Sequence, residues 1–233
     1  MILKDNINSN NIKLLIYDVD GTLVEFVTLF KLLKESFDIH GMRFKEEYFK
    51  QYVASVSKAL DENRKDFSKS SLVQSFEKYF SILEKSNVNA NEYLNTLLSL
   101  EYKYTQMHDG VDITLKELFS KYPQVVSTNW FADSQKTKIN KFDLLKYFNR
   151  IYGCEMYYPK PNRKHFERIS SDYNLSPDEC LIIGDSFSDI KASAYGYNTL
   201  LVDYKKEKTN LYNLSTYVVD DFRDVSKVLA RKK

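Results

Sequence analysis

Two aspartates one residue apart, Asp18 and Asp20, directly follow the apolar run "IKLLIY". Burying a carboxylate is costly unless it is paired or binds a cation. The two residues are therefore either turn residues, since Asp and Gly are common in turns, or part of a site that needs paired negative charge. Gly21 follows them and lets the chain leave the strand sharply.

Polar residues also follow two later apolar runs. Thr128 and Asn129 come after "QVVS", and Asp185 and Asp189 come after "CLIIG". In a parallel α/β sheet, ligands bind beyond the carboxyl ends of the strands. We therefore expect these side chains to gather at one rim of a sheet, together with the first two aspartates.

The chemistry of this set is that of phosphoryl transfer. Several carboxylates at one rim repel each other unless a hard cation neutralises them, and Mg²⁺ is commonly held by a few carboxylates, waters and substrate phosphate. One carboxylate can act as a nucleophile and form an aspartyl-phosphate, while a second protonates the leaving oxygen and later activates water. The hydroxyl of Thr128 and the ammonium of Lys160, in the turn "YPKPNRKHF", would stabilise charge on the transferred group.

The elements that must position these residues have an α/β pattern. Five apolar runs are continuous rather than alternating, as expected for strands buried on both faces of a parallel sheet: residues 12–17, 124–127, 180–184, 199–202 and 216–219. Three stretches between them have apolar residues at helical spacing: residues 134–148, 162–173 and 187–196. The last of these ends at Gly196, a suitable helix C-cap.

One long region interrupts this alternation. From Val24 to about His108 the sequence predicts helices only, over residues 26–37, 44–62, 72–86 and 91–107. We therefore expect an α/β catalytic core from residues 1–23 and 109–233, and an all-helical cap from residues 24–108 inserted after the first strand. The many Tyr and Phe residues of the insertion are interpreted chiefly as packing between its helices.

Composition narrows the class of protein. Of the 233 residues, 43% are apolar and 28% are charged, as in globular proteins. A net charge of +2 indicates neither a nucleic-acid nor a membrane surface, and no run approaches the roughly twenty apolar residues of a membrane span. Cys154 and Cys180 lack metal-site spacing, and no signal peptide is evident. We expect a cytoplasmic protein, a monomer or homodimer. The residues suited to phosphoryl transfer, rather than the composition, predict a small phosphorylated metabolite as its partner.

Four segments, in order, resemble the motifs of the haloacid dehalogenase (HAD) superfamily of phosphohydrolases. They are "DVDGTL" (18–23), "VVSTN" (125–129), "KPNRKHF" (160–166) and "GDSFSD" (184–189). The helical insertion is similar to the type-one cap of that superfamily, and the resemblance extends from Lys13 to about Phe222. It implies a Rossmann-like parallel sheet flanked by helices, a cap that closes over the site, and Mg²⁺ as cofactor.

The resemblance also implies a role for each matching residue. It makes Asp18 the nucleophile and Asp20 the general acid/base, and it has Lys160 orient the nucleophile. Phosphate binding would fall to Thr128, Asn129 and Lys160, and Mg²⁺ binding to Asp18, Asp20 (through its backbone carbonyl), Asp185 and Asp189, the last either directly or from beside the ion.

The sequence departs from the family pattern at the third motif, which often runs Lys-Pro-Asp-Pro. Here Asn162 and Arg163 replace the Asp-Pro pair. Ser127 stands next to Thr128, so either hydroxyl could face the site. The family's dehalogenases lack a second aspartate at the position of Asp20, so the resemblance favours a phosphatase. A phosphomutase acting on a sugar phosphate and a non-catalytic phosphate-binding module of the same fold are the alternatives.

Overall fold

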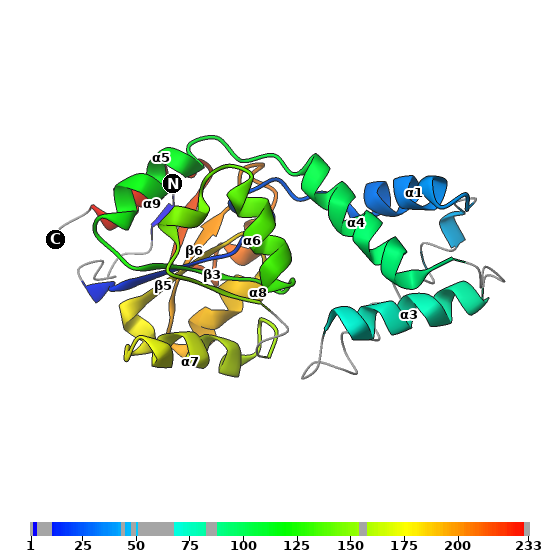
Figure 1. The fold of residues 1–233 in the computed structure, drawn as a ribbon. Helices are drawn as coiled ribbons and strands as arrows, with labels where there is room; N and C mark the ends of the chain where they lie inside the picture. Colours follow the sequence, from blue (N-terminus) through cyan, green and yellow to red (C-terminus); the bar gives the residue numbers. More distant parts are fainter. Residues whose placement is uncertain are drawn as a thin grey trace. The chain divides into compact units, whose positions relative to one another are not determined.

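The computed structural model describes residues 2–3, 11–42, 45–47, 50, 68–82, 88–153 and 158–230. The chain divides into two compact units (Figure 1). Unit 1 comprises Met1–Glu25 and Gln106–Lys233, and unit 2 comprises Phe26–Thr105. These boundaries lie two or three residues from those expected for a core and a cap. The roles of catalytic core and cap stay predictions for the two units.

Unit 1 is built on a seven-stranded sheet with the strand order β1-β7-β6-β5-β2-β3-β4. Six strands are parallel, and β1 pairs with β7 in the antiparallel sense. The strands are β1 (Ile2–Leu3), β2 (Leu14–Tyr17), β3 (Gln124–Ser127), β4 (Arg150–Tyr152), β5 (Cys180–Gly184), β6 (Asn198–Val202) and β7 (Tyr217–Val219). The expected α/β, Rossmann-like parallel sheet flanked by helices is thereby confirmed.

The continuous apolar runs become strands because both faces of the sheet are covered. In β2, Leu15 and Tyr17 belong to one hydrophobic cluster, whereas Leu14 and Ile16 belong to the cluster on the opposite face. All four side chains are fully buried. A half-exposed strand would need polar residues at every second position, which this run lacks.

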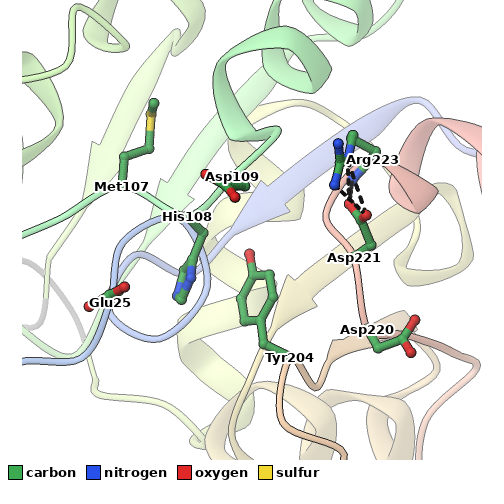
Figure 2. A pocket seen from close by; sticks show the side chains of 8 residues that line it. All are labelled: Glu25, Met107, His108, Asp109, Tyr204, Asp220, Asp221 and Arg223. Atoms are coloured by element: carbon green, nitrogen blue, oxygen red, sulfur yellow. Dashed lines mark hydrogen bonds and ion pairs between the residues drawn. The ribbon is translucent and has the colours of Figure 1, made fainter.

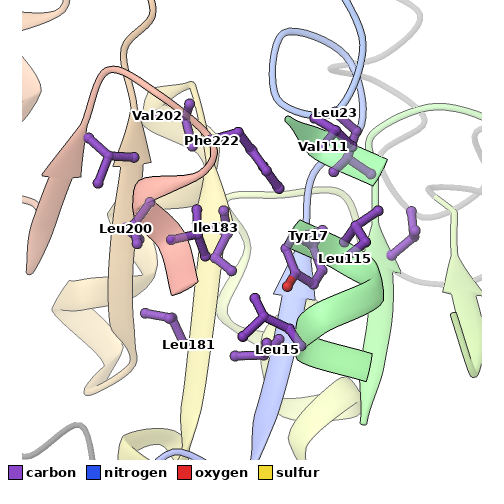
Figure 3. Packing of buried hydrophobic residues seen from close by; sticks show 14 of the residues in the cluster. Leu15, Tyr17, Leu23, Val111, Leu115, Leu181, Ile183, Leu200, Val202 and Phe222 are labelled. Carbon is purple, nitrogen blue, oxygen red and sulfur yellow. The ribbon is translucent and has the colours of Figure 1, made fainter. Parts of the chain in front are cut away.

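Helices cover each face of the sheet. On one side lie α5 (Val111–Phe119) and α9 (Asp224–Leu229), and on the other lies α7 (Arg163–Asp172) (Figure 1). The 3₁₀ turn η4 (Lys191–Tyr195) packs in the same cluster as α7. Figure 3 shows the first core, where Leu115 of α5 lies near Leu15 and Tyr17 of β2. Two further helices, α6 (Ala132–Asn140) and α8 (Phe187–Ile190), follow the ends of β3 and β5.

Several sequence predictions are corrected by the structure. The helix expected over 134–148 ends at Asn140, because Asp143 takes a left-handed φ of 57° and the chain turns to bury Leu144. Only the 3₁₀ turn η2 (Leu145–Tyr147) follows. The stretch 187–196 is the short α8 continued by η4, and it ends at Gly196 in the left-handed conformation as expected.

Four strands and helices of unit 1 have no counterpart among the predictions: β1, β4, α5 and α9. Two more 3₁₀ turns, η3 (Pro177–Glu179) and η5 (Thr209–Leu211), lie in connections. Cys180 is a buried free thiol in the core, and burial raises its pKa to about 12. Cys154 lies outside the described residues.

Unit 2 contains the helices α1 (Leu29–Ile39), α3 (Lys69–Ile82) and α4 (Ala90–Tyr104). The helix expected over 44–62 lies largely outside the described residues. Aromatic side chains of the three helices pack edge to face around Tyr93, as predicted for the aromatic residues of this region: Phe37, Phe76 and Phe80 have ring centroids 5.0–6.0 Å from it. None of the helices in the described part of the chain is long and apolar enough to cross a membrane.

The two segments that lead out of unit 1 are hydrogen-bonded to each other. Val24 and Met107 form an antiparallel bridge. The amide of Glu25 donates to the carbonyl of Gln106 at 2.8 Å, and the amide of His108 donates to the carbonyl of Leu23 at 3.1 Å. The insertion therefore starts and ends at one closed backbone junction within unit 1.

Candidate active site

The residues predicted to do chemistry lie at the carboxyl ends of three neighbouring strands. Asp18 follows β2, Thr128 follows β3, and Asp185 follows β5. The sheet order places β2 between the other two strands, and parallel strands end at the same edge of a sheet. Residues more than a hundred positions apart in the sequence are thus brought to one rim.

Lys160 connects the parts of this site. Its ammonium donates to Asp18 Oδ1 at 2.7 Å, to Asp189 Oδ1 at 2.5 Å and to the backbone carbonyl of Ser127 at 2.9 Å. The side chain is only 1% exposed, so the three donors of the ammonium are all used inside the protein. Lys160 therefore fixes one oxygen of Asp18. The other oxygen, Oδ2, has Thr22 Oγ1 as its nearest donor in the described part of the chain, at 3.5 Å.

Burial and charge act in opposite directions on this pair. Burial raises the pKa of Asp18 to about 8, although the Lys160 ammonium opposes the shift, and the carboxylates of Asp189 and Asp185 raise it further. Burial lowers the pKa of Lys160, but Asp18 and Asp189 outweigh this, so the pKa of Lys160 lies above its usual value. Lys160 therefore stays protonated. Further positive charge beside Asp18 would lower the pKa of its carboxyl group.

Three carboxylates form a candidate cation site. Asp18, Asp185 and Asp189 each offer an oxygen, and these oxygens lie within 4.8 Å of one another. An all-oxygen set of this kind suits a hard cation such as Mg²⁺. Asp189 also accepts from Ser186 Oγ at 2.7 Å, so it holds Lys160 and the start of α8 at the same time.

Gly21 makes room for this cluster. Its φ is +85°, and a Cβ on it would lie 2.4 Å from Asp185 Oδ2. A side chain there would suffer both an unfavourable backbone conformation and a collision with a carboxylate. The glycine after the two aspartates is therefore needed for the position of Asp185 as well as for the turn.

Ser127 and Thr128 point to different surroundings. Ser127 Oγ lies 2.8 Å from Nε2 of the buried His165, whose Nδ1 lies 2.6 Å from the carbonyl of Tyr158. Burial lowers the pKa of His165 to about 4, so the ring is neutral, donates from Nδ1 and accepts from Ser127 at Nε2. Thr128 Oγ1 accepts from the amide of Trp130 and from Gln135 Nε2 at 3.1 Å each, which leaves its own proton free to donate.

We expect Ser127→Ala and Thr128→Val to separate stability from activity. Ser127→Ala leaves His165 Nε2 without a donor, so the free energy of unfolding should fall by about 1–3 kcal/mol while turnover stays unchanged. Thr128→Val should lower kcat by about 10²-fold, the usual cost of removing one donor to developing charge, and Thr128→Ser should restore it. Urea unfolding and phosphate release measure the two effects. A larger loss of turnover in Ser127→Ala would reverse the assignment.

Asn129 is tied to the backbone of Lys160. Its Nδ2 donates to the Lys160 carbonyl at 2.9 Å, and its Oδ1 accepts from the Lys160 amide at 2.7 Å. This pair of bonds joins the end of β3 to the turn before α7 and holds the lysine backbone in place. Binding of phosphate by the Asn129 side chain stays a prediction.

Asp20 does not belong to the three-carboxylate cluster. Its carboxylate is turned to α6, where Lys138 Nζ lies 2.6 Å from Oδ1 and Gln135 Nε2 lies 2.5 Å from Oδ2. Neither partner was predicted from the sequence. Their spacing of three residues places them on one face of the helix, but the direction in which that face points depends on tertiary packing. The role given to the Asp20 backbone carbonyl stays a prediction.

Lys208 is another basic residue that sequence analysis missed. It forms an ion pair with Asp185 Oδ2 and opposes the effect of burial, which raises the pKa of Asp185. Asp203 accepts from the amides of Glu207 and Lys208 at 3.1 and 2.8 Å and shapes this loop. The polar loop that follows β6 thus contributes a positive charge, that of Lys208, to the site.

A pocket of about 270 Å³ lies beside the junction and the loops after β6 and β7 (Figure 2). The rings of His108 and Tyr204 stack there with centroids 3.9 Å apart, and Tyr204 donates to the carbonyl of Thr22 at 2.7 Å. Asp221 is paired with Arg223 (Figure 2). Burial lowers the pKa of His108, so its ring is neutral at pH 7.

Comparison with known proteins gives matches over most of the chain. Residues 15–202 match the sequence profile of the haloacid dehalogenase-like hydrolases. Phosphoglycolate phosphatase of Nitrosococcus oceani is 25% identical over 209 residues, which cover 80% of this chain and 85% of the relative.

Solved structures with this fold include hydrolases of two kinds. A HAD-hydrolase of Bacillus subtilis bound to magnesium aligns with a TM-score of 0.69 and 18% identity, over 94% of this chain and 99% of that one. A 2-haloacid dehalogenase of Pseudomonas syringae pv. Tomato aligns with a TM-score of 0.73 and 20% identity, again over 94% and 99%. At these identities the two comparisons show a similarity of fold alone.

Proposed function

The chain belongs to the haloacid dehalogenase-like hydrolase family, and from this we propose that it is a Mg²⁺-dependent phosphatase of a small phosphorylated metabolite. The observation that carries the proposal is the placement of Asp18. One of its oxygens is held by Lys160, the other has no donor closer than 3.5 Å among the described residues, and Asp185 and Asp189 stand beside it. A carboxylate fixed in this way suits nucleophilic attack on phosphorus.

The proposed reaction has two halves. In the first, a carboxylate oxygen of Asp18 bonds to phosphorus, the ester P–O bond breaks, and a proton from Asp20 passes to the leaving oxygen. In the second, water attacks the phosphorus, its proton passes to Asp20, and the bond to Asp18 breaks. Thr128 donates to the phosphoryl oxygens throughout, and Lys160 keeps Asp18 in place.

Asp18, Asp185 and Asp189 would hold Mg²⁺, and the fit rests on their convergent oxygens. The ion, when bound, supplies positive charge that offsets the phosphoryl oxygens and favours the ionised form of Asp18. The charges of Lys160 and Lys208 neutralise two of the three carboxylates, so a cation and a phosphate can both be accommodated without a large net charge.

The second aspartate supports a phosphatase over a dehalogenase. The resemblance associates an aspartate at the position of Asp20 with the family's phosphatases, and the phosphoglycolate phosphatase of N. oceani aligns over most of this chain. The test is release of phosphate from a panel of phosphorylated sugars, nucleotides and short acids, including 2-phosphoglycolate, with halide release from 2-haloacids measured in parallel. Halide release without phosphate release would overturn the proposal.

Mg²⁺ should bind the protein independently of turnover. In thermal unfolding, saturating Mg²⁺ should stabilise the wild type by about 3 kcal/mol at one hundred times its dissociation constant. Asp185→Asn should lose most of this stabilisation, whereas Asp112→Asn, an exposed residue of α5, should keep it. Chelation should abolish hydrolysis. Equal Mg²⁺ stabilisation of all three proteins would place the ion elsewhere.

A further inference from the structure

Two buried side chains of α6 hold the carboxylate of Asp20. Lys138 is 1% exposed and donates to Oδ1 at 2.6 Å, and Gln135 is fully buried and donates to Oδ2 at 2.5 Å. A buried ammonium is costly unless it is paired. The ion pair with Asp20 compensates the buried charge of Lys138. Both oxygens of the carboxylate are therefore oriented by the same helix.

Gln135 also links Asp20 to Thr128. The same Nε2 atom lies 3.1 Å from Thr128 Oγ1, the hydroxyl proposed to contact the phosphoryl group. This orientation of the amide suits the ionised form of Asp20, because the reverse orientation would bring the amide oxygen to within 2.5 Å of a carboxylate oxygen. Gln135 Oε1 is buried and has no hydrogen-bond partner among the described residues. An unpaired polar atom has a cost, which the donation to Asp20 and Thr128 offsets.

We propose that Gln135 and Lys138 are positioning residues that place Asp20 for proton transfer to the leaving oxygen. The inference rests on the proposed phosphatase function. Each carboxylate oxygen has two lone-pair sites, so an oxygen held from the side of α6 still has a second site for the leaving group. By tying Asp20 and Thr128 to one amide, the protein sets the distance between the proton donor and the phosphoryl group.

This role makes a specific kinetic prediction. Proton donation matters more for a basic leaving group than for a weakly basic one. Phenolate is more basic than 4-nitrophenolate, and the two phosphate esters otherwise have nearly the same shape. The value of kcat/KM depends on the steps up to and including departure of the alcohol. It therefore reports on the half-reaction in which Asp20 is the acid. A displaced Asp20 should therefore impair phenyl phosphate more than 4-nitrophenyl phosphate.

The experiment compares Lys138→Met with the wild type on both esters, in the presence of Mg²⁺. The variant should lower kcat/KM by about 10²-fold for phenyl phosphate and about 10-fold for 4-nitrophenyl phosphate, within the usual contribution of general acid catalysis. Lys138→Arg should recover most of the loss. The matched control is Lys136→Met, because Lys136 is exposed on the same helix, and it should change neither value. Gln135→Met provides the same comparison if Lys138→Met does not fold.

A double-mutant cycle with Asp20→Asn completes the test. If Lys138 acts through Asp20, adding Lys138→Met to Asp20→Asn should cause little further loss. Equal losses on the two esters, or full additivity with Asp20→Asn, would overturn the positioning role and leave the phosphatase proposal standing. A wild type that releases phosphate from neither ester would remove the proposed function and this inference with it.

Discussion

Asp18→Asn is expected to abolish phosphate release, by about 10⁴-fold or more in kcat, the order seen when a catalytic nucleophile is removed. The amide cannot form the covalent intermediate, although it has nearly the same shape as the carboxylate. The fold should survive, because Lys160 keeps its 2.5 Å contact with Asp189 and one of three mutually repelling carboxylates is lost. Hydrolysis of 4-nitrophenyl phosphate and thermal unfolding measure the two properties.

The matched control for this substitution is Asp112→Asn, which changes an exposed carboxylate of the same unit. Its turnover and its unfolding temperature should equal those of the wild type. In addition, a rapidly acid-quenched wild-type reaction should contain a phosphorylated peptide that spans Asp18, and Asp18→Asn should contain none. Appreciable turnover by Asp18→Asn would rule out the covalent mechanism.

Lys160→Met should lower both activity and stability. The substitution leaves Asp18 and Asp189 buried without their shared counter-charge, and breaking a buried ion pair by removing one partner typically costs about 3–5 kcal/mol. Turnover should fall by at least about 10²-fold, because the orientation of the nucleophile and a positive charge near the phosphoryl group are lost together. Chemical unfolding and phosphate release are the measurements.

Added Mg²⁺ should restore part of the stability of Lys160→Met, since a cation between the carboxylates replaces some of the missing positive charge. It should restore little of the turnover. Lys164→Met, which removes an exposed lysine four residues later on α7, is the control and should change neither property. A Lys160→Met protein as stable as the wild type would show that the carboxylates are neutralised in another way.

The strands and their polar ends could be predicted from the sequence because each depends on local composition. The run "LLIY" is buried on both faces, and Asp18 follows it at the strand end. Parallel pairing then brings together residues that follow different strands, such as Thr128 and Asp185, without any further information. For this reason the residues around Asp18 can be identified from the sequence alone.

The partners of Asp20 were not predicted because their burial depends on tertiary packing. A lysine on a helix is ordinarily solvated, and nothing local to Lys138 indicates that it is 1% exposed. The edge strand β4 was missed for a similar reason, since Arg150 is exposed and only Tyr152 is fully buried. The end of α6 at Asn140 depends on how Leu144 packs in the core. Helical periodicity in the sequence does not reveal this packing.

The closed junction between Glu25 and Gln106 has a consequence for protein engineering. Because the two departing segments already pair with each other, a short hairpin turn could join them in place of unit 2. Closing so small a loop costs less conformational entropy than closing the long natural insertion. All of the candidate catalytic residues lie in unit 1, so the shortened chain would be a compact scaffold. Foreign inserts could be grafted at that junction to alter which molecules reach an otherwise unchanged set of reactive groups.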